Sequence, residues 1–252
     1  MNPDLKKLLD CPRPAAIPAI RWPAELRLFV LAPHPDDFDA IGVTLRFFRQ
    51  NGNPIQLAVV SGSASGVLDE FCLPPDSATK AAIREQEQRD SLRFFGLGEE
   101  CAAFLRLRED DAGAPLDDAV NETAIRRQLV AHRPQVVFLP HGEDSNAGHR
   151  RAHAMFLRAA AALDEPPAAF LIRDPKTLNF RCDLYMPFDE EKARWKRWLL
   201  LHHRSQEHRN RRQRGRGFDD RILDVNRLIA AELSCSAAFA EAFQVEVVPQ
   251  PI

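Results

Sequence analysis

The stretch "LRLFVLAPHPDDFDAIG" (residues 26–42) decides the interpretation of this chain, because an apolar run ends abruptly in a cluster of acids. Its first seven residues are mostly aliphatic or aromatic, which is typical of a strand buried on both faces. A histidine, His34, and three aspartates then follow within six residues. The adjacent carboxylates of Asp36 and Asp37 repel each other unless a positive charge lies near them. The sequence therefore predicts that a strand ends here beside something positive.

Three further apolar runs share this character and are bounded by Gly or Pro: "IQLAVVSG" (55–62), "CAAFLRL" (101–107) and "QVVFLP" (135–140). Helical patterns separate and follow these runs, near residues 39–50, 78–96, 119–132 and 148–163. Regular alternation of strand and helix predicts parallel strands joined by right-handed crossovers. We therefore expect an α/β fold, a three-layer Rossmann-like sandwich with a mostly parallel sheet.

The chain is long enough to form one domain with a substantial core, since 45% of its 252 residues are hydrophobic. We expect a single domain over residues 1–252, with a Rossmann-like metal-binding core at 25–165. Charged helical patterns near 189–209 and 219–233 follow this core. Residues 166–252 are therefore predicted to form a C-terminal addition of helices and strands that packs on the core.

Composition narrows the class of protein. The formal net charge of −2 gives no reason to expect a nucleic-acid partner. The five cysteines are scattered and lack a C-x-x-C pair, which argues against a disulfide framework and a thiolate zinc site. No run of about 20 apolar residues could cross a bilayer, and the first residues lack an apolar segment of signal-peptide length. We expect a cytoplasmic protein without a membrane span, and the sequence leaves homo-oligomerisation open.

Polar clusters follow both the first and the fourth predicted strands, and the second cluster reads "HGEDSNAGHRRAH" (141–153). Ligands of open α/β sheets usually bind beyond the carboxyl ends of the strands, where the strand order reverses, so we expect the two loops to face each other. Imidazole and carboxylate side chains suit Zn²⁺ in an open catalytic geometry, with Fe²⁺ as an alternative. Taken singly, Asp36 or Asp37 is more simply a helix N-cap and a loop histidine is usually solvated. Two such clusters at corresponding strand ends favour a metal site.

These motifs resemble a known family. The stretches that carry the resemblance are "PHPDD" (33–37), "REQE" (84–87), "DSNAGHRRAH" (144–153), "HRSQ" (203–206) and "AEAF" (240–243). Together they resemble the LmbE/PIG-L family of metal-dependent deacetylases, which act on N-acetylglucosamine-type substrates. The resemblance implies that His34, Asp37 and His149 are zinc ligands. It also implies that Asp36 is the general base and that Arg84 contacts the sugar or its substituent.

Two positions depart from the family pattern. Most members carry Glu directly after the paired aspartates, whereas this chain has Phe38 followed by Asp39, and Asn146 stands where many members have histidine. An amide can donate a hydrogen bond to a tetrahedral oxyanion but cannot supply a proton, so the acid role falls on Asp36. Two further histidines are candidates for substrate contact: His141 and His153. For each of them, a position away from the site is an equal alternative.

The basic run "HRSQEHRNRRQRGRG" (203–217) contains six arginines. It is either a solvated helix end or a site for RNA or for an anionic sugar carrier such as a diphosphate. It lacks the aromatic side chains that stack on bases, so no nucleic-acid partner is expected.

The sequence thus predicts a zinc-dependent hydrolase that removes an acetyl group from a small N-acetylated sugar or glycoconjugate. Metal-activated water would attack the amide, and the products would be acetate and a free amine. Two alternatives stay open. One is a hydrolase of another amide or ester with the same metal site, and the other is a metal-retaining binding protein without turnover.

Overall fold

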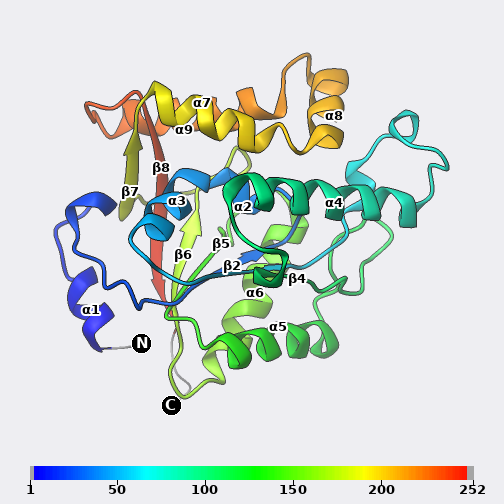
Figure 1. Cartoon of the computed structure of the whole chain (residues 1–252). Coiled ribbons are helices and arrows are strands. Elements are labelled where there is room, and N and C mark those ends of the chain that lie inside the picture. Colours follow the sequence, from blue (N-terminus) through cyan, green and yellow to red (C-terminus); the bar gives the residue numbers. More distant parts are fainter. Residues whose placement is uncertain (1–2, 249–252) are drawn as a thin grey trace.

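The computed structural model describes residues 3–248, which fold around one eight-stranded sheet (Figure 1). The strand order is β1-β7-β8-β6-β5-β2-β3-β4, and neighbouring strands are parallel except where β8 pairs with β6 and β7. The strands are β1 (Ala15–Ala16), β2 (Leu28–Ala32), β3 (Ile55–Val59), β4 (Ala102–Phe104), β5 (Val136–Pro140), β6 (Ala168–Ile172), β7 (Leu184–Phe188) and β8 (Phe239–Val247). The predicted mostly parallel α/β sheet is confirmed.

The helices begin and end near the predicted positions in the first part of the chain. They are α1 (Pro3–Leu9), α2 (Asp37–Ala40), α3 (Gly42–Gln50), α4 (Ser77–Phe95), α5 (Ala119–His132), α6 (Ala147–Ala161), α7 (Glu190–Leu200), α8 (Arg204–Arg214) and α9 (Phe218–Glu232). Aspartates at 76, 118 and 189 accept hydrogen bonds from backbone N–H groups in the first turns of α4, α5 and α7, which fixes where these helices begin. Within residues 3–248, no helix combines the length and apolar character needed to cross a bilayer.

The central strand β2 separates two cores, as expected for a sheet covered on both faces. Leu28 and Val30 point to the core that contains apolar residues of α3, α4 and α7. Phe29 and Leu31 point to the opposite core, which is built from α5 and α6. All five residues of β2 are therefore buried, and the apolar run that opens the sequence analysis is explained by burial on both faces.

The strand order reverses between β2 and β5. From β2 the chain moves outward through β3 to β4 and then returns to β5, which pairs with the other edge of β2 from Leu28↔Val136 to Val30↔Phe138. The loops that follow β2 and β5 consequently leave the same edge of the sheet side by side. This arrangement is the one in which α/β proteins usually bind their ligands.

The C-terminal part extends the same sheet rather than forming a separate one, because β8 lies antiparallel between β6 and β7. The helical pattern expected at 189–209 is interrupted: α7 ends at Leu200 and α8 begins at Arg204. The cause is His203, which is fully buried and donates to the carboxylate of Asp39 below the first loop. A polar contact from the turn therefore breaks a segment that charge pattern alone presents as continuous.

A buried ion pair joins the two parts of the chain. Lys196 of α7 donates to Glu241 of β8 at 2.7 Å and to the carbonyl oxygen of Ala40 at 2.6 Å, and both charged side chains are at most 1% exposed. Glu241 also accepts the backbone N–H groups of Val43 and Thr44, at 3.1 and 2.7 Å. The motif "AEAF" therefore supplies an anchor for the first turn of α3, directly after the acidic loop.

Candidate active site at the carboxyl edge of the sheet

The backbone of the loop after β2 sends its two adjacent carboxylates in different directions. Asp36 has a φ of 132°, a strained conformation for a residue with a side chain. Its carboxylate accepts a hydrogen bond from Arg84 at 2.8 Å, whereas Asp37 turns back and accepts from the backbone N–H of His34 at 2.8 Å. The side chain of Asp36 makes no capping hydrogen bond at the start of α2, so the N-cap interpretation does not describe it.

The side chains of His34, Asp37 and His149 meet at one point. His34 Nδ1 lies 3.2 Å from His149 Nε2 and 3.4 Å from Asp37 Oδ2, and His149 Nε2 lies 3.6 Å from Asp37 Oδ1. Ligand atoms of one tetrahedral zinc ion, with bonds of about 2.0–2.1 Å, are about 3.3 Å apart. The three side chains therefore have the types and the spacing of a metal-ligand set, although they come from two segments more than one hundred residues apart in sequence.

The electrostatics of the cluster favour the protonation states that a cation needs. Burial lowers the pKa of His34, which keeps its imidazole neutral. Burial alone would raise the pKa of Asp37, but His149 and His34 hold it well below its usual range, so this carboxyl is ionised. Burial also opposes a charge on His149, yet the carboxylates of Asp37 and Asp144 outweigh it and raise the pKa of His149. The acids around His149 thus stabilise positive charge where a metal ion would sit.

Two further carboxylates orient His149 from behind. Its Nδ1 lies 2.9 Å from Asp144 Oδ2 and 3.6 Å from Asp174 Oδ2, so the ring proton belongs on Nδ1 and the Nε2 lone pair faces the cluster. Asp144 is held in turn by the backbone N–H of Asn146 at 2.6 Å. Asp144 and Asp174 had no predicted role. The first lay in a quoted motif, and the second follows β6 at the same sheet edge, which is the signal that could have identified both.

Two adjoining hollows open beside the cluster. The Arg84 hollow, of about 290 Å³, is lined by His34, Ser63, Gly66 and Arg84 among others, and the Arg221 hollow, of about 170 Å³, by Asp37, Asp174, Arg214 and Arg221 among others. Five residues line both: Asp36, Asn146, Lys176, Gln206 and Arg209. Lys176 and Arg209 were not assigned from the sequence. Lys176 comes from the connection after β6, and Arg209 from the basic run.

A family model described as PIG-L, GlcNAc-PI de-N-acetylase, matches residues 29–160 of the chain, which include β2 and the complete ligand cluster. The chain belongs to this family. The comparison with curated proteins gave no match.

Solved structures similar to this PIG-L family member include two deacetylases and one hydratase. They are N,N'-diacetylchitobiose deacetylase from Pyrococcus horikoshii (TM-score 0.70, 16% identity, 87% of this chain and 83% of that chain), the A40926 pseudoaglycone deacetylase Dbv21 (TM-score 0.68, 17% identity, 90% and 100%) and GalB, the 4-carboxy-2-hydroxymuconate hydratase from Pseudomonas putida KT2440 (TM-score 0.65, 16% identity, 90% and 99%). At these identities the likeness establishes the fold. Because one neighbour is a hydratase, the reaction has to be argued from the site.

The departure of this chain at Phe38 from the PIG-L pattern has a structural counterpart. Phe38 is fully buried and packs edge-on against Phe95 of α4, with ring centroids 5.1 Å apart. The next residue, Asp39, carries the polar contacts: it accepts from Ser91 at 3.1 Å, from Gln88 at 3.2 Å and from His203. Asp39 thereby ties the loop to α4 and to the turn before α8 from below.

Arg84 both holds Asp36 and lines the Arg84 hollow. Its side chain is 2% exposed, and it donates to the carbonyl oxygen of Pro35 as well as to Asp36. A Cβ added at Gly66 would approach Arg84 Nη1 to 2.6 Å, so a larger residue there would displace the Arg84 guanidinium. Arg84 therefore fixes the orientation of Asp36 while its lining position keeps the predicted substrate contact open.

The structure brings Asn146 into the site and leaves two other candidates outside it. Asn146 lines both hollows and caps α6, where its Oδ1 accepts from the N–H of Gly148 at 2.8 Å. His141 accepts from the N–H of Glu143 at 2.9 Å and packs against Phe180, and His153 lies 2.9 Å from Glu246 of β8. Neither histidine lines the two hollows. Substrate contact by His141 or His153 stays a prediction.

Proposed function

We propose that this PIG-L family member is a zinc-dependent deacetylase that removes the acetyl group of an N-acetylated sugar or glycoconjugate. The observation that carries the proposal is the meeting of His34, Asp37 and His149 beside a fourth residue, the differently oriented acid Asp36. Family membership supports a deacetylase, and the choice of zinc and of a sugar is our inference.

The donor set fits a divalent cation with an open coordination position. Two imidazole nitrogens and one carboxylate are the ligands that catalytic zinc sites use, and Fe²⁺ accepts the same set. When bound, the ion would polarise the acetamide carbonyl and lower the pKa of a water molecule from about 15.7 towards about 7. Asp144 behind His149 is the outer carboxylate that such sites use to orient the imidazole.

Asp36 is suited to move the proton. It lies next to Asp37 in sequence but faces Arg84 and both hollows, so it stands beside the ligand cluster without belonging to it. It would take the proton from the attacking water as the water oxygen bonds to the carbonyl carbon. The same carboxyl would then pass the proton to the amine nitrogen as the C–N bond breaks, giving acetate and a free amine.

Asn146 is suited to stabilise charge rather than to transfer a proton. Because its Oδ1 caps α6, its amide NH₂ group is the part that can serve the hollows it lines. An amide donor directed at the developing oxyanion lowers the barrier by roughly 3 kcal/mol in other hydrolases. The remaining proton chemistry therefore belongs to Asp36.

The test is acetate release by the metal-loaded protein from a panel of N-acetylated sugars. Asp36→Asn should slow acetate release by roughly 10²- to 10⁴-fold while leaving the metal content unchanged. Asp164→Asn, at the opposite edge of the sheet, is the matched control and should leave the rate unchanged. An unaltered rate in Asp36→Asn would refute the base assignment. Absence of acetate from every sugar would refute the deacetylase and favour a binding protein.

A further inference from the structure

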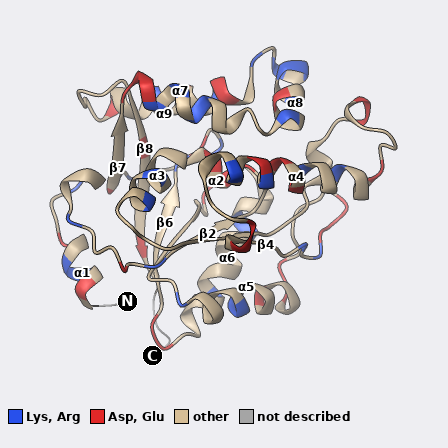
Figure 2. Cartoon of the chain, in the orientation of Figure 1, with Lys and Arg blue, Asp and Glu red and all other residues tan. Residues whose placement is uncertain are grey.

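Five of the six arginines of the basic run, all except Arg204, divide into two groups by their partners. Arg211, Arg212 and Arg216 are exposed and pair with acids: Arg211 with Glu207, Arg212 with Glu70 at 3.8 Å and Arg216 with Asp224. Figure 2 shows the basic positions of α8 in blue at the top of the molecule. This outward group is the solvated helix end that the sequence offered as one alternative.

The second group faces the Arg221 hollow. Arg209 and Arg214 of α8, Arg221 of α9 and Lys176 line it together. The hydrogen bonds that two of them make go to neutral amides, from Arg209 to Gln213 at 3.2 Å and from Arg221 to Asn210 at 2.7 Å. Among residues 3–248, none of these four basic side chains forms an ion pair with a carboxylate within 4.0 Å.

The inward group holds like charges close together, and the carboxylates of Asp36 and Asp174 offset them only in part. Burial lowers the pKa of Arg209, and the guanidinium groups of Arg84 and Arg214 lower it further. The pKa of Arg221 is lowered by burial and then by Arg214. Clustered positive charges at the wall of a cleft attract anions, and burial strengthens the effect because solvent screens the charges less.

Two carboxylates that line the Arg221 hollow, Asp36 and Asp174, interact with groups at the end nearest the ligand cluster. Asp36 is paired with Arg84 at 2.8 Å, and Asp174 lies 3.6 Å from His149. The hollow is therefore polarised, with the acids at the ligand cluster and the cations on the walls formed by α8, α9 and the connection after β6.

We propose that the Arg221 hollow binds an anionic group, a phosphate or a carboxylate, carried by the substrate, and that Arg209, Arg214, Arg221 and Lys176 hold it. The assignment rests on the proposed deacetylase, because it places the anion on the molecule whose acetamide reaches the ligand cluster. Guanidinium groups bind phosphate and carboxylate through paired, charge-assisted hydrogen bonds, which gives the inward arginines their function.

The sizes of the two hollows agree with this division. The Arg221 hollow, at about 170 Å³, corresponds to about six water molecules and suits a substituent rather than a whole ligand. The Arg84 hollow, at about 290 Å³, adjoins it across Asp36 and Asn146 and has room for the sugar ring. The substrate class is consequently an acidic N-acetylated amino sugar.

The first experiment measures binding of inorganic phosphate to the full chain by calorimetry and requires no turnover. The variants are Arg214→Gln, whose side chain is exposed, and the double variant Arg214→Gln/Arg221→Gln. Their matched control is Arg211→Gln/Arg212→Gln, which removes the same charge from the outward face of α8. We expect the inward double variant to bind phosphate about tenfold more weakly or worse, and the outward double variant to bind as the wild type does. Equal weakening in both double variants, or no binding by the wild type, would overturn the anion site.

The second experiment compares acetate release from three sugars that share the acetamide: N-acetylglucosamine, its 6-phosphate and N-acetylmuramic acid. A charged sugar should be preferred over the neutral one by about tenfold or more in kcat/KM, and the preferred one identifies the anion. The preference should disappear in the inward double variant and persist in the outward one. Acetate release without any charge preference would overturn the anion site and leave the deacetylase standing. Phosphate binding without acetate release from any sugar would overturn the deacetylase and leave the anion site standing.

Discussion

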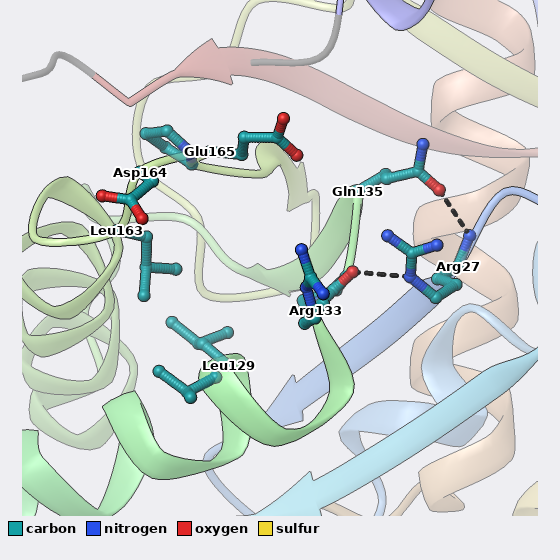
Figure 3. Close-up of a pocket in the computed structure, with 10 residues that line it drawn as sticks. Arg27, Leu129, Arg133, Gln135, Leu163, Asp164 and Glu165 are labelled. Atoms are coloured by element: carbon teal, nitrogen blue, oxygen red, sulfur yellow. Dashed lines mark hydrogen bonds between the residues drawn. The ribbon is translucent and has the colours of Figure 1, made fainter.

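The two ends of the β2–β5 pair show what distinguishes a functional hollow from a surface hollow. At the amino ends lies the larger one, of about 510 Å³, bordered by Arg27, Arg133 and Gln135 (Figure 3). There Arg27 Nε donates to the carbonyl oxygen of Arg133 at 2.7 Å, and the backbone N–H of Arg27 donates to Gln135 at 3.2 Å. The polar groups at this end bind each other and close the loops.

At the carboxyl ends the same two strands deliver side chains whose needs are not met by the protein alone. Two imidazole nitrogens, His34 Nδ1 and His149 Nε2, face one another at 3.2 Å. Beside them, four basic side chains from α8, α9 and the connection after β6 line a hollow and form no ion pair within 4.0 Å among the described residues. Volume therefore does not identify the site. The site is identified instead by side-chain atoms that converge and can still bind a ligand, and these lie where the strand order reverses.

The largest expected effect comes from removing a ligand at the carboxyl edge. His149→Ala should abolish stoichiometric zinc binding and acetate release together, since it leaves only two protein ligands for the ion. Elemental analysis of the purified variant, after dialysis against trace zinc, measures the first effect. Full zinc occupancy in His149→Ala would contradict the ligand set.

A smaller effect, on metal affinity, is expected from changing Asp144, which lies behind His149. Asp144→Asn keeps the size of the side chain but weakens its hold on His149 Nδ1, so metal affinity should fall by about 10- to 100-fold. Competition with a zinc chelator of known affinity measures the change. Asp224→Asn, which alters a surface acid paired with Arg216, is the control and should keep the wild-type affinity. Equal zinc affinity of Asp144→Asn and the wild type would mean that Asp144 does not support the ligand.

The smallest effect is expected at the amino edge. Arg27→Ala should leave zinc content and acetate release unchanged and lower the free energy of unfolding by about 1 kcal/mol, because it removes one exposed hydrogen bond. Chemical denaturation measures the stability. A loss of activity comparable with that of Asp144→Asn would mean that the two ends of the strand pair are not separate in function.

The parallel half of the fold could be predicted from sequence because its strands are buried on both faces and its helices lie between them. The antiparallel strand β8 and the short β1 could not be located in the same way. The first half of β8 is apolar except for Glu241. The charge of Glu241 is tolerated in the interior only because Lys196, 45 positions earlier in the sequence, forms an ion pair with it. A pairing between distant residues of that kind leaves no local signal.

The residues of the site also differ in whether their position could be predicted from the sequence. His34, Asp37 and His149 lie in dense polar motifs at strand ends, so topology predicts that their two segments face each other, and the family resemblance singled out these three residues. Lys176, Arg209 and Arg221 lie in charged segments whose sequence does not tell inward from outward. The difference between Arg209 and Arg211 is two positions along α8, and only the packing of that helix decides which one faces the hollow.

The hold of Glu241 on Val43 and Thr44, across 198 and 197 positions, has a consequence for biosynthesis. Before β8 has been synthesised, the nascent polypeptide already contains "PHPDD" (33–37) but lacks the Glu241 carboxylate that binds the first turn of α3. Residue 241 must therefore be synthesised before this corner of the molecule can reach its final structure. A shorter nascent chain would carry the candidate metal ligands His34 and Asp37 before the contacts that fix the neighbouring helix α3 can form.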